Sequence, residues 1–347
     1  MPPRVVALGD ANVDLITRLV PACVGGVEVV RPITEIYAGG SVANTAVCLS
    51  RLGCRVAFIG KTGDDAFGRF VRDDFTKEGV DTRYLSVSRD FPTVVVLVFL
   101  DRAGERQISL WPARSAAHTQ LRPQEIDAEA LQGACWLHAS GLSLREEPAR
   151  SATLSAFRLA RSTGVRTSLD LNLRMEFFGM TEEEVAVFRQ AVELTDVLFG
   201  SASEEIAPLA RMLGGQSAAG PRSAGVGQSG DEGPEPAILE ACGALGAGRR
   251  IVVARRGARG ALVVTPEDSL ESPAFDVPVV DTTGSGDAFN GGFLAALCEG
   301  RHVSEAARWG NAAAAMNVMG VGARGVLARE AFDRLLLSGG PAHAERR

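Results

Sequence analysis

The sequence lacks a long hydrophobic run, and this argues against a membrane-spanning helix. Its longest strongly apolar stretch, 94–100, is far shorter than the roughly 20 residues that such a helix requires, and its β-branched residues indicate a buried strand. The first nine residues also lack the apolar core and cleavage pattern of a signal peptide. We therefore expect a soluble protein that has no membrane partner.

Basic clusters and metal-binding motifs are missing as well. The net charge is −6, and the Lys and Arg residues are scattered, which argues against a nucleic acid or another polyanion as partner. The six cysteines form no Cys-x-x-Cys motif, and the four histidines are dispersed, so a zinc cluster is not indicated. Widely spaced cysteines in apolar surroundings favour a reducing cytoplasm.

Strand-like apolar runs alternate with helical stretches along most of the chain. The expected strands are 4–8, 56–59, 136–138, 166–170, 197–199, 251–254 and 261–265. This succession is typical of an α/β fold, a doubly wound and mostly parallel sheet with helices on both faces. Ligands bind such sheets beyond the carboxyl ends of the strands, so functional residues should lie in strand-to-helix loops.

Two stretches, 16–38 and 92–111, are rich in Val, Ile, Leu and Thr but are not followed by a helix. They read as paired strands that build a small β-sheet lid beside a cleft; the alternative is that they extend the main sheet. We expect a single domain over 1–337 with lid strands at about 12–38 and 92–112. The Gly/Ser/Pro-rich segment 213–236 reads as a flexible insertion, and 338–347 as a tail.

The most informative segment is 279–289, VVDTTGSGDAF, followed by the helical run 290–297. Gly284 and Gly286 allow the backbone to approach an anion, and the first N–H groups of the helix would hold a phosphoryl oxygen. Asp287 lies one residue past this loop and could deprotonate an incoming hydroxyl. The alternative is an ordinary capped helix with an Asp in its first turn.

A second glycine-rich element, 39–44 (GGSVAN), also precedes a helix. Paired glycines again permit close backbone approach, and Asn44 offers both a donor and acceptors that suit vicinal sugar hydroxyls. Alone, such a motif is frequently only a turn.

Together, and in this order, the two segments resemble the two signatures of the ribokinase-like (PfkB) carbohydrate kinase family. Residues 9–14 (GDANVD), 60–68 with its glycine-acid loop, and 170–174 (DLNLR) are similar to further family elements. The resemblance covers the whole chain apart from 213–236. It implies an ATP- and Mg²⁺-dependent transfer of the γ-phosphate to a sugar hydroxyl, with K⁺ as an additional cation in some relatives.

The resemblance also implies site residues. It makes Asp287 the base and Gly284, Ser285 and Gly286 the donors to the transferred phosphate. The sugar contacts would be Asp14, Gly39, Gly40, Asn44 and Arg174. The nucleotide contacts would be Thr283, Arg255, Gly257, Gly260, Asn311 and Ala314. Glu204 would organise Mg²⁺ through water, although Ser201 stands where the family has Asn, and the carbonyls of Asp281 and Thr283 would hold a monovalent cation.

The acceptor remains open between several sugars. Ser115-Ala116-Ala117 and 137–142 resemble the 2-keto-3-deoxygluconate kinase branch, but 110–112 (LWP) stands where that branch grips the carboxylate, and the nearest cation is Arg114. A neutral sugar such as fructose or ribose is therefore an equal candidate.

The sequence is also compatible with other classes of function than a sugar kinase. One is a regulator of the same fold that binds a ligand without catalysis, and another is a nucleoside or vitamin kinase. A nicotinamide-dependent dehydrogenase is disfavoured because the first strand leads into GDANVD rather than G-x-G-x-x-G. The resemblance further implies a homodimer joined through the lid sheets, whose exposed edges invite pairing.

Overall fold

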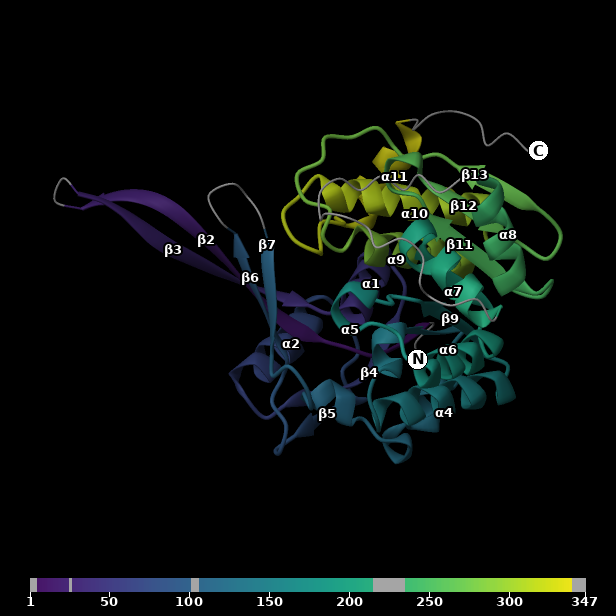
Figure 1. The fold of residues 1–347 in the computed structure, drawn as a ribbon, viewed down its shortest axis with the longest axis horizontal. Helices are drawn as coiled ribbons and strands as arrows, with labels where there is room; N and C mark the ends of the chain where they lie inside the picture. The colour runs from purple at the N-terminus through teal and green to yellow at the C-terminus, as the bar shows by residue number, and fades with distance from the viewer. Residues whose placement is uncertain (1–4, 25–26, 101–105, 215–234, 339–347) are drawn as a thin grey trace.

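A nine-stranded sheet forms the centre of the molecule (Figure 1). The structure, a computed structural model, describes residues 5–24, 27–100, 106–214 and 235–338. The sheet order is β13-β12-β11-β10-β9-β8-β1-β4-β5. The strands are β1 (Val5–Leu8), β4 (Val56–Gly63), β5 (Leu85–Ser88), β8 (Trp136–Ser140), β9 (Arg166–Asp170), β10 (Val197–Ser201), β11 (Ile251–Arg255), β12 (Ala261–Val264) and β13 (Ser269–Ser272). Neighbours pair in parallel except at β11–β12 and β12–β13.

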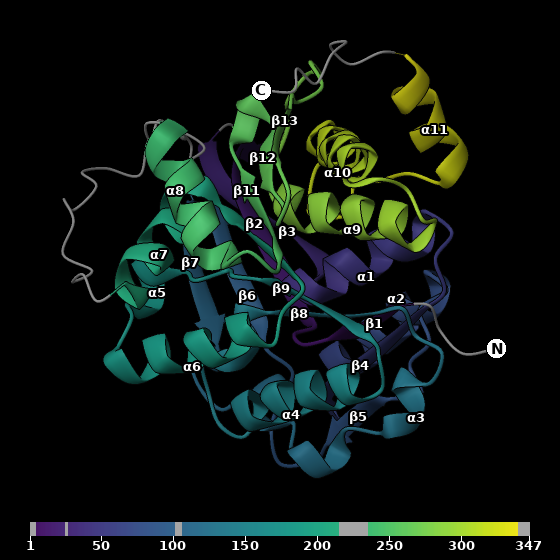
Figure 2. The ribbon, with the colours of Figure 1, turned by 90° about the vertical axis from the view of Figure 1, so that its right-hand side faces the viewer.

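Helices cover both faces of this sheet (Figure 2). They are α1 (Ser41–Arg51), α2 (Ala66–Lys77), α3 (Ala128–Leu131), α4 (Ala149–Ser162), α5 (Met175–Phe178), α6 (Glu182–Glu193), α7 (Ala207–Leu213), α8 (Glu235–Gly246), α9 (Ser285–Cys298), α10 (Val303–Val318) and α11 (Arg329–Leu337). Short 3₁₀ helices lie at 117–120, 123–125, 141–144 and 257–259, and a π-helix at 202–206. The predicted doubly wound α/β fold is thus confirmed.

The alternation of side chains along each strand separates two hydrophobic cores. On β1, Val5 and Ala7 pack into the core under α1, α9, α10 and α11, whereas Val6 and Leu8 pack into the core under α4, α6, α7 and α8. Successive side chains of a strand point to opposite faces, so a strand between two helical layers must be apolar on both. All four residues of β1 are fully buried.

A separate four-stranded sheet of order β3-β2-β6-β7 projects from the body (Figure 1). Its strands are β2 (Asn12–Val24), β3 (Val27–Gly39), β6 (Val95–Leu100) and β7 (Arg106–Trp111). The small sheet predicted from the two Val-rich stretches is therefore confirmed, and the alternative that they extend the main sheet is wrong. Because β2 begins right after β1 and β3 leads directly into α1, the sheet is anchored at the carboxyl edge of β1.

Sequence patterns missed β5 and β13, edge strands of four residues each, which are too short for an apolar alternation to stand out. Of the predicted insertion 213–236, residues 215–234 lie outside the described residues, as do 339–347 of the predicted tail; Leu213 ends α7 and Glu235 begins α8. Among the residues that the structure describes, none of the helices has the length and apolar character needed to cross a membrane.

Candidate active site

The N-termini of α1 and α9 meet at the carboxyl edge of the main sheet, and glycines shape both. Gly40 precedes α1 with φ 105° and Gly284 precedes α9 with φ 72°, both in the region that favours glycine. Asp10, directly after β1, accepts hydrogen bonds from the backbone N–H of Ser41 (2.7 Å) and Val42 (3.4 Å). Its carboxylate therefore caps α1 and fixes the helix to the end of β1.

Asp287, the third residue of α9, is held by two donors from α1. Ser41 Oγ donates to its Oδ1 (2.7 Å) and Asn44 Nδ2 to its Oδ2 (2.9 Å), while Thr45 Oγ1 donates to its backbone carbonyl (3.1 Å). Burial raises the pKa of Asp287 to about 7; the two donors partly offset this, and Asp170 adds to it. A carboxyl with this pKa can accept and return a proton near neutral pH.

Asp14, near the start of β2, provides a second carboxylate at the same edge. Asn12 Nδ2 donates to its Oδ1 (2.5 Å). A Cβ on Gly39 would lie 2.4 Å from Asp14 Oδ2, so only glycine leaves room for this carboxylate. Burial raises the pKa of Asp14 to about 6, against the lowering effects of Asn12 and Arg324. The structure thus brings the predicted sugar contacts Asp14 and Gly39 together.

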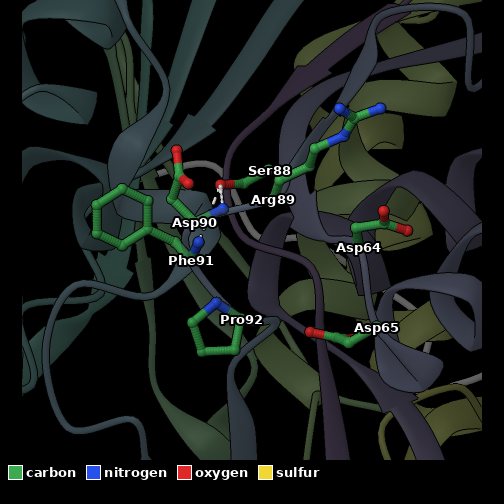
Figure 3. A pocket seen from close by; sticks show the side chains of 7 residues that line it. All are labelled: Asp64, Asp65, Ser88, Arg89, Asp90, Phe91 and Pro92. Atoms are coloured by element: carbon green, nitrogen blue, oxygen red, sulfur yellow. Dashed lines mark hydrogen bonds between the residues drawn. The ribbon is translucent and has the colours of Figure 1, made fainter.

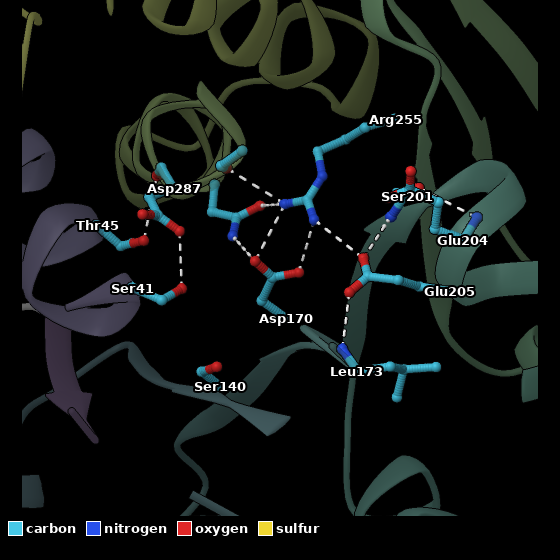
Figure 4. A network of polar contacts seen from close by, with 12 residues as sticks. Ser41, Thr45, Ser140, Asp170, Leu173, Ser201, Glu204, Glu205, Arg255 and Asp287 are labelled. Atoms are coloured by element: carbon cyan, nitrogen blue, oxygen red, sulfur yellow. Dashed lines mark hydrogen bonds and ion pairs between the residues drawn. The ribbon is translucent and has the colours of Figure 1, made fainter. Parts of the chain in front are cut away.

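A buried network lies beside Asp287 at the ends of three adjacent strands (Figure 4). Arg255 at the end of β11 donates to both carboxylate oxygens of Asp170 (2.8 and 3.2 Å), to Asn290 Oδ1 (2.8 Å) and to the carbonyl of Gly286 (3.2 Å). Its Nη2 lies 3.5 Å from Glu205 Oε2. One guanidinium therefore joins two carboxylates to the glycine loop of α9.

The charged groups of this network change one another's pKa. Burial opposes the charge of Arg255, but Asp170 and Glu205 outweigh it and raise its pKa. Burial and the neighbouring Asp170 raise the pKa of Glu205. Glu205 also accepts hydrogen bonds from the backbone N–H of Leu173 (2.8 Å) and Ser201 (2.6 Å). These donors stabilise its carboxylate where it lies.

The structure does not bring Glu204 or Arg174 to this site. Glu204 is exposed and its neighbour Glu205 is buried, because residues 202–206 form a π-helical turn that shifts the face on which each side chain lies. Arg174, which precedes α5, is exposed, and its backbone has the left-handed conformation with φ 46°. Glutamates stand at both 204 and 205, and no pattern in the sequence predicts the π-helical turn that buries the second one. Sequence reasoning therefore missed Glu205.

The glycine loop lies at the N-terminus of α9 as predicted. Its first-turn N–H groups have no acceptor within the helix, which makes this end suited to an anion. Ser285 N–H, however, donates to the carbonyl of Thr282 (3.2 Å). Thr283 donates from its backbone N–H and Oγ1 to Asp281 Oδ1 (2.9 and 2.7 Å), and its carbonyl accepts from Asn317 Nδ2 (2.7 Å).

The predicted nucleotide contacts are spread over several elements. Arg255 lies inside the network just described rather than on an outer loop. Gly257 is exposed, whereas Gly260 is packed so that a Cβ would meet the carbonyl of Ser272. Asn311 Nδ2 donates to the carbonyl and Oγ of Ser272 (both 2.9 Å), which fixes β13 to α10. Ala314, on the same helix, is half-buried.

A surface hollow of about 220 Å³ lies elsewhere, at the ends of β4 and β5 (Figure 3). Its lining residues are Asp64, Asp65, Ser88, Arg89, Asp90, Phe91 and Pro92. None of these residues contacts Asp287 or Arg255 by a hydrogen bond; Asp65 instead caps α2 through Gly68 N–H and accepts from Thr93 N–H. The chemistry-bearing residues therefore do not line this hollow.

The carboxylates beside Arg255 are the candidates for holding Mg²⁺ at this site. Carboxylate oxygens are the ligands that Mg²⁺ takes, and it usually keeps several waters. Asp170 and Glu205 supply such oxygens, but Arg255 is already paired with both. Among the described residues, no three His, Cys, Asp or Glu side chains are arranged as metal ligands. Because both carboxylates already pair with Arg255, they fit an ion held through water rather than one bound directly.

A doubly wound sheet, a small sheet beside its edge and a carboxylate at a glycine-rich helix N-terminus are features that suit phosphoryl transfer. The chain belongs to the pfkB family of carbohydrate kinases, whose profile matches residues 2–329. The family and the enzyme class predicted from the motifs are thereby confirmed.

Two curated relatives and one solved structure illustrate the range of this family. Aminoimidazole riboside kinase of Salmonella typhimurium is 32% identical, over 94% of this chain and 88% of its own. 5-Dehydro-2-deoxygluconokinase of Clostridium botulinum is 30% identical, over 84% of this chain and 83% of its own. A double mutant of fructokinase from Vibrio cholerae, solved with fructose, ADP and potassium ion, is 30% identical with a TM-score of 0.74, over 97% of this chain and 99% of its own.

Proposed function

We propose that this protein transfers the γ-phosphate of ATP to a hydroxyl of a neutral sugar, with Asp287 as the general base. The observation that carries the proposal is the setting of Asp287. It is a half-buried carboxyl with a pKa of about 7, oriented by Ser41 and Asn44, at the N-terminus of the glycine-loop helix.

In the proposed reaction, the hydroxyl oxygen of the sugar attacks the γ-phosphorus of ATP, while the hydroxyl proton passes to Asp287. The bond from phosphorus to the bridging oxygen of ADP breaks, and ADP leaves with that electron pair. The first-turn N–H groups of α9 at Gly284–Gly286 offset the charge on the transferred phosphoryl oxygens. Arg255, through the Gly286 carbonyl, keeps this turn in place.

Metal ions enter the proposal through the chain's own carboxylates. Mg²⁺, when bound, neutralises the charge that develops on the phosphates. We assign its water-mediated contacts to Glu205 with Asp170, in place of the exposed Glu204. For a monovalent cation, the carbonyls of Asp281 and Thr283 stay the candidates, and the fructokinase structure solved with potassium ion supports the use of such a cation.

The charges at the sugar side favour a neutral acceptor over a sugar acid. Asp10, Asp14 and Asp287 gather at this edge, and Arg324, the cation that lowers the pKa of Asp14, is paired with Asp74. Arg114 is exposed and no hydrogen bond ties it to these residues in the described part of the chain. A substrate carboxylate would meet these like charges, and the cation at this edge, Arg324, already pairs with Asp74, so binding the carboxylate costs energy. Fructose or a riboside therefore fits better than 2-keto-3-deoxygluconate.

The lid sheet supports a homodimer as the state of this kinase. Large apolar side chains on its strands are more than two-fifths exposed: Leu19, Ile33, Ile36, Phe99, Ile108 and Trp111. Exposed apolar side chains on an open sheet favour pairing with a second copy. We place the protein in the reducing cytoplasm, in keeping with its six cysteines, which form no disulfide in the described part of the chain.

The test is ADP release from Mg·ATP against fructose, ribose, aminoimidazole riboside, adenosine and 2-keto-3-deoxygluconate. We expect stimulation by fructose or a riboside. Preference for the sugar acid would overturn the neutral-acceptor proposal and leave the kinase assignment intact. Measurable ATP binding with no stimulation by any acceptor would favour a regulator that binds ligands without catalysis.

A further inference from the structure

The loop that follows α10, residues 320–325, packs against the glycine loop of α9. A Cβ on Gly284 would lie 2.6 Å from Ala323 Cβ, so the two backbones touch. Gly322 N–H donates to Asp281 Oδ2 (3.0 Å), and Gly325 N–H donates to Asn317 Oδ1 (2.8 Å). The loop is therefore fixed to the segment that carries Asp287.

Arg51, in the last turn of α1, fixes the same loop from its other side. Its Nη1 donates to the carbonyls of Arg324 (2.7 Å) and Val326 (2.8 Å). Its Nε and Nη2 donate to the two carboxylate oxygens of Glu78 (2.8 and 2.6 Å). With its backbone held in this way, Arg324 has a defined direction in which its side chain can extend.

The Arg324 side chain is 11% exposed and reaches Asn44. Its Nε donates to Asn44 Oδ1 (3.0 Å), and its Nη1 forms an ion pair with Asp74 on α2. Asn44 in turn donates from Nδ2 to Asp287 Oδ2 (2.9 Å). A continuous chain of hydrogen bonds thus runs from Arg324 through the amide of Asn44 to the carboxylate of Asp287.

The chemistry of the two ends determines how the amide is oriented. A guanidinium can only donate, and an ionised carboxylate can only accept. The oxygen of Asn44 must therefore face Arg324, and its NH₂ group must face Asp287. With the amide reversed, the oxygen would face the carboxylate and the NH₂ group would face the guanidinium, and both contacts would be repulsive.

We propose that Arg324 is a positioning residue, which holds the Asn44 amide so that its N–H group points at Asp287 and keeps that carboxylate ionised at lower pH. The proposal deepens the proposed function, since it assumes that Asp287 is the base. It assigns a task to a residue that lies outside both glycine-rich segments.

Other charged or titratable groups face Asp287 and stay unchanged in the test. Asp10 after β1 and Asp170 on β9 raise its pKa. Arg255 on β11 and the Cys48 thiol on α1 interact with it electrostatically. Because these groups are the same in the wild type and the variant, a shift seen on changing Arg324 alone does not come from them.

The test is Arg324→Met, which keeps the length of the side chain and removes its donors. Once released, the Asn44 amide can rotate, and Asp287 loses part of a hydrogen bond to its charged form. The pKa of the base then rises, so activity is lost on the acidic side and retained at high pH. We expect the acidic limb of the kcat profile to move up by about one pH unit. An unmoved limb would overturn the proposal.

Arg324 also lowers the pKa of Asp14, so the Asp287 titration must be followed directly. In protein labelled with ¹³C at the aspartate carboxyls, the signal that disappears in Asp287→Asn belongs to Asp287. Its midpoint should rise in Arg324→Met. In an Asn44→Ala background, Arg324→Met should add no further shift to this signal. Fully additive shifts would overturn the role of Asn44 as intermediary.

Asp74→Asn is the matched control, because it removes the same ion pair and leaves the Nε contact to Asn44. Its thermal unfolding should change about as much as that of Arg324→Met, while the Asp287 midpoint stays at the wild-type value. An equal midpoint shift in Asp74→Asn would assign the effect to the ion pair and overturn the proposal. Asp287→Asn distinguishes a failure of the proposed function from a failure of the positioning role. If it turns over normally, the base assignment fails; if it is inactive while Arg324→Met leaves the midpoint unchanged, only the positioning role fails.

Discussion

Arg255 donates from Nη2 to Asp170 Oδ1 over 2.8 Å, joining residues that lie 85 positions apart in the chain. Both side chains are largely buried, and Glu205 lies on the other side of the same guanidinium. The cation therefore compensates two carboxylates at once, as Figure 4 shows.

Replacing Arg255 with Met should destabilise the protein strongly, because two buried carboxylates lose their cation. Breaking a buried pair from one side costs about 3–5 kcal/mol in the free energy of unfolding, which denaturant titration at pH 7.5 measures. Arg301→Met is the control, since Arg301 is 44% exposed and pairs with Glu305 and Glu299, whose side chains are 51% and 31% exposed. Such a pair is worth about 1 kcal/mol at most. Equal losses in both variants would contradict the compensating role of Arg255.

Asp287→Asn should remove turnover and spare nucleotide binding. Asparagine keeps the shape but cannot accept a proton, so kcat should fall by about 10²- to 10⁴-fold. Steady-state kinetics and calorimetric titration with ATP measure the two quantities. Asp90→Asn, at an exposed position in the hollow of Figure 3, should leave kcat at the wild-type value. Near-normal turnover of Asp287→Asn would remove this residue from the mechanism.

The same carboxylate should make stability depend on pH. The folded-state pKa of Asp287 is about 7 against an ordinary 3.8, so between these values the folded state binds more protons than the unfolded state. The free energy of unfolding therefore falls as pH rises from about 4 to about 7 and levels off above. Asp287→Asn lacks this loss, so it should be more stable than the wild type at pH 8, by an amount that shrinks toward pH 4. Denaturant unfolding curves of both proteins at pH 5 and pH 8 measure this effect. A difference in the free energy of unfolding that does not change with pH would contradict the raised pKa.

Gly39→Ala should weaken sugar binding more than it weakens the fold. The added methyl would lie 2.4 Å from Asp14 Oδ2, the far end of a short side chain that can turn away. Asp14 then no longer presents its carboxylate to the sugar, so KM for the sugar should rise roughly 10-fold, about the worth of one hydrogen bond to a charged group. Gly243→Ala is the control, because a Cβ there meets nothing within 4 Å. A normal KM in Gly39→Ala would separate Asp14 from sugar binding.

The layered fold and the central pair of the site follow from local patterns. The Val5–Leu8 run is apolar at every position, which only a strand covered on both faces satisfies. Asn44 and Asp287 each lie in the first turn of a helix that follows glycines, and helix N-termini at one sheet edge converge. Local patterns thus placed each residue at a helix start, and the family resemblance joined them in one site, where Asn44 donates to Asp287.

The supporting residues could not be predicted in the same way. Arg324 and Asn44 are 280 positions apart, and no motif links them. The family resemblance placed Arg255 among the nucleotide contacts, yet its direction is set by Asp170 at the end of β9 and by Glu205 in the π-helical turn after β10. Such contacts arise from tertiary packing, to which a pattern along the chain is blind.

The adjacent glutamates 204 and 205 offer a matched pair for the metal prediction. Glu205 is buried beside Arg255 and Asp170, whereas Glu204 is exposed, because the π-helical turn rotates only one of them inward. Glu205→Gln should raise the Mg²⁺ concentration needed for half-maximal turnover by about 10-fold or more, the usual effect of losing a group that orders the water around a metal. Glu204→Gln should leave this concentration unchanged. Titration of Mg²⁺ at fixed ATP measures both. If Glu204→Gln gives the larger change, the metal contact runs through the residue that the family motif indicated, and the π-turn must rearrange when nucleotide binds.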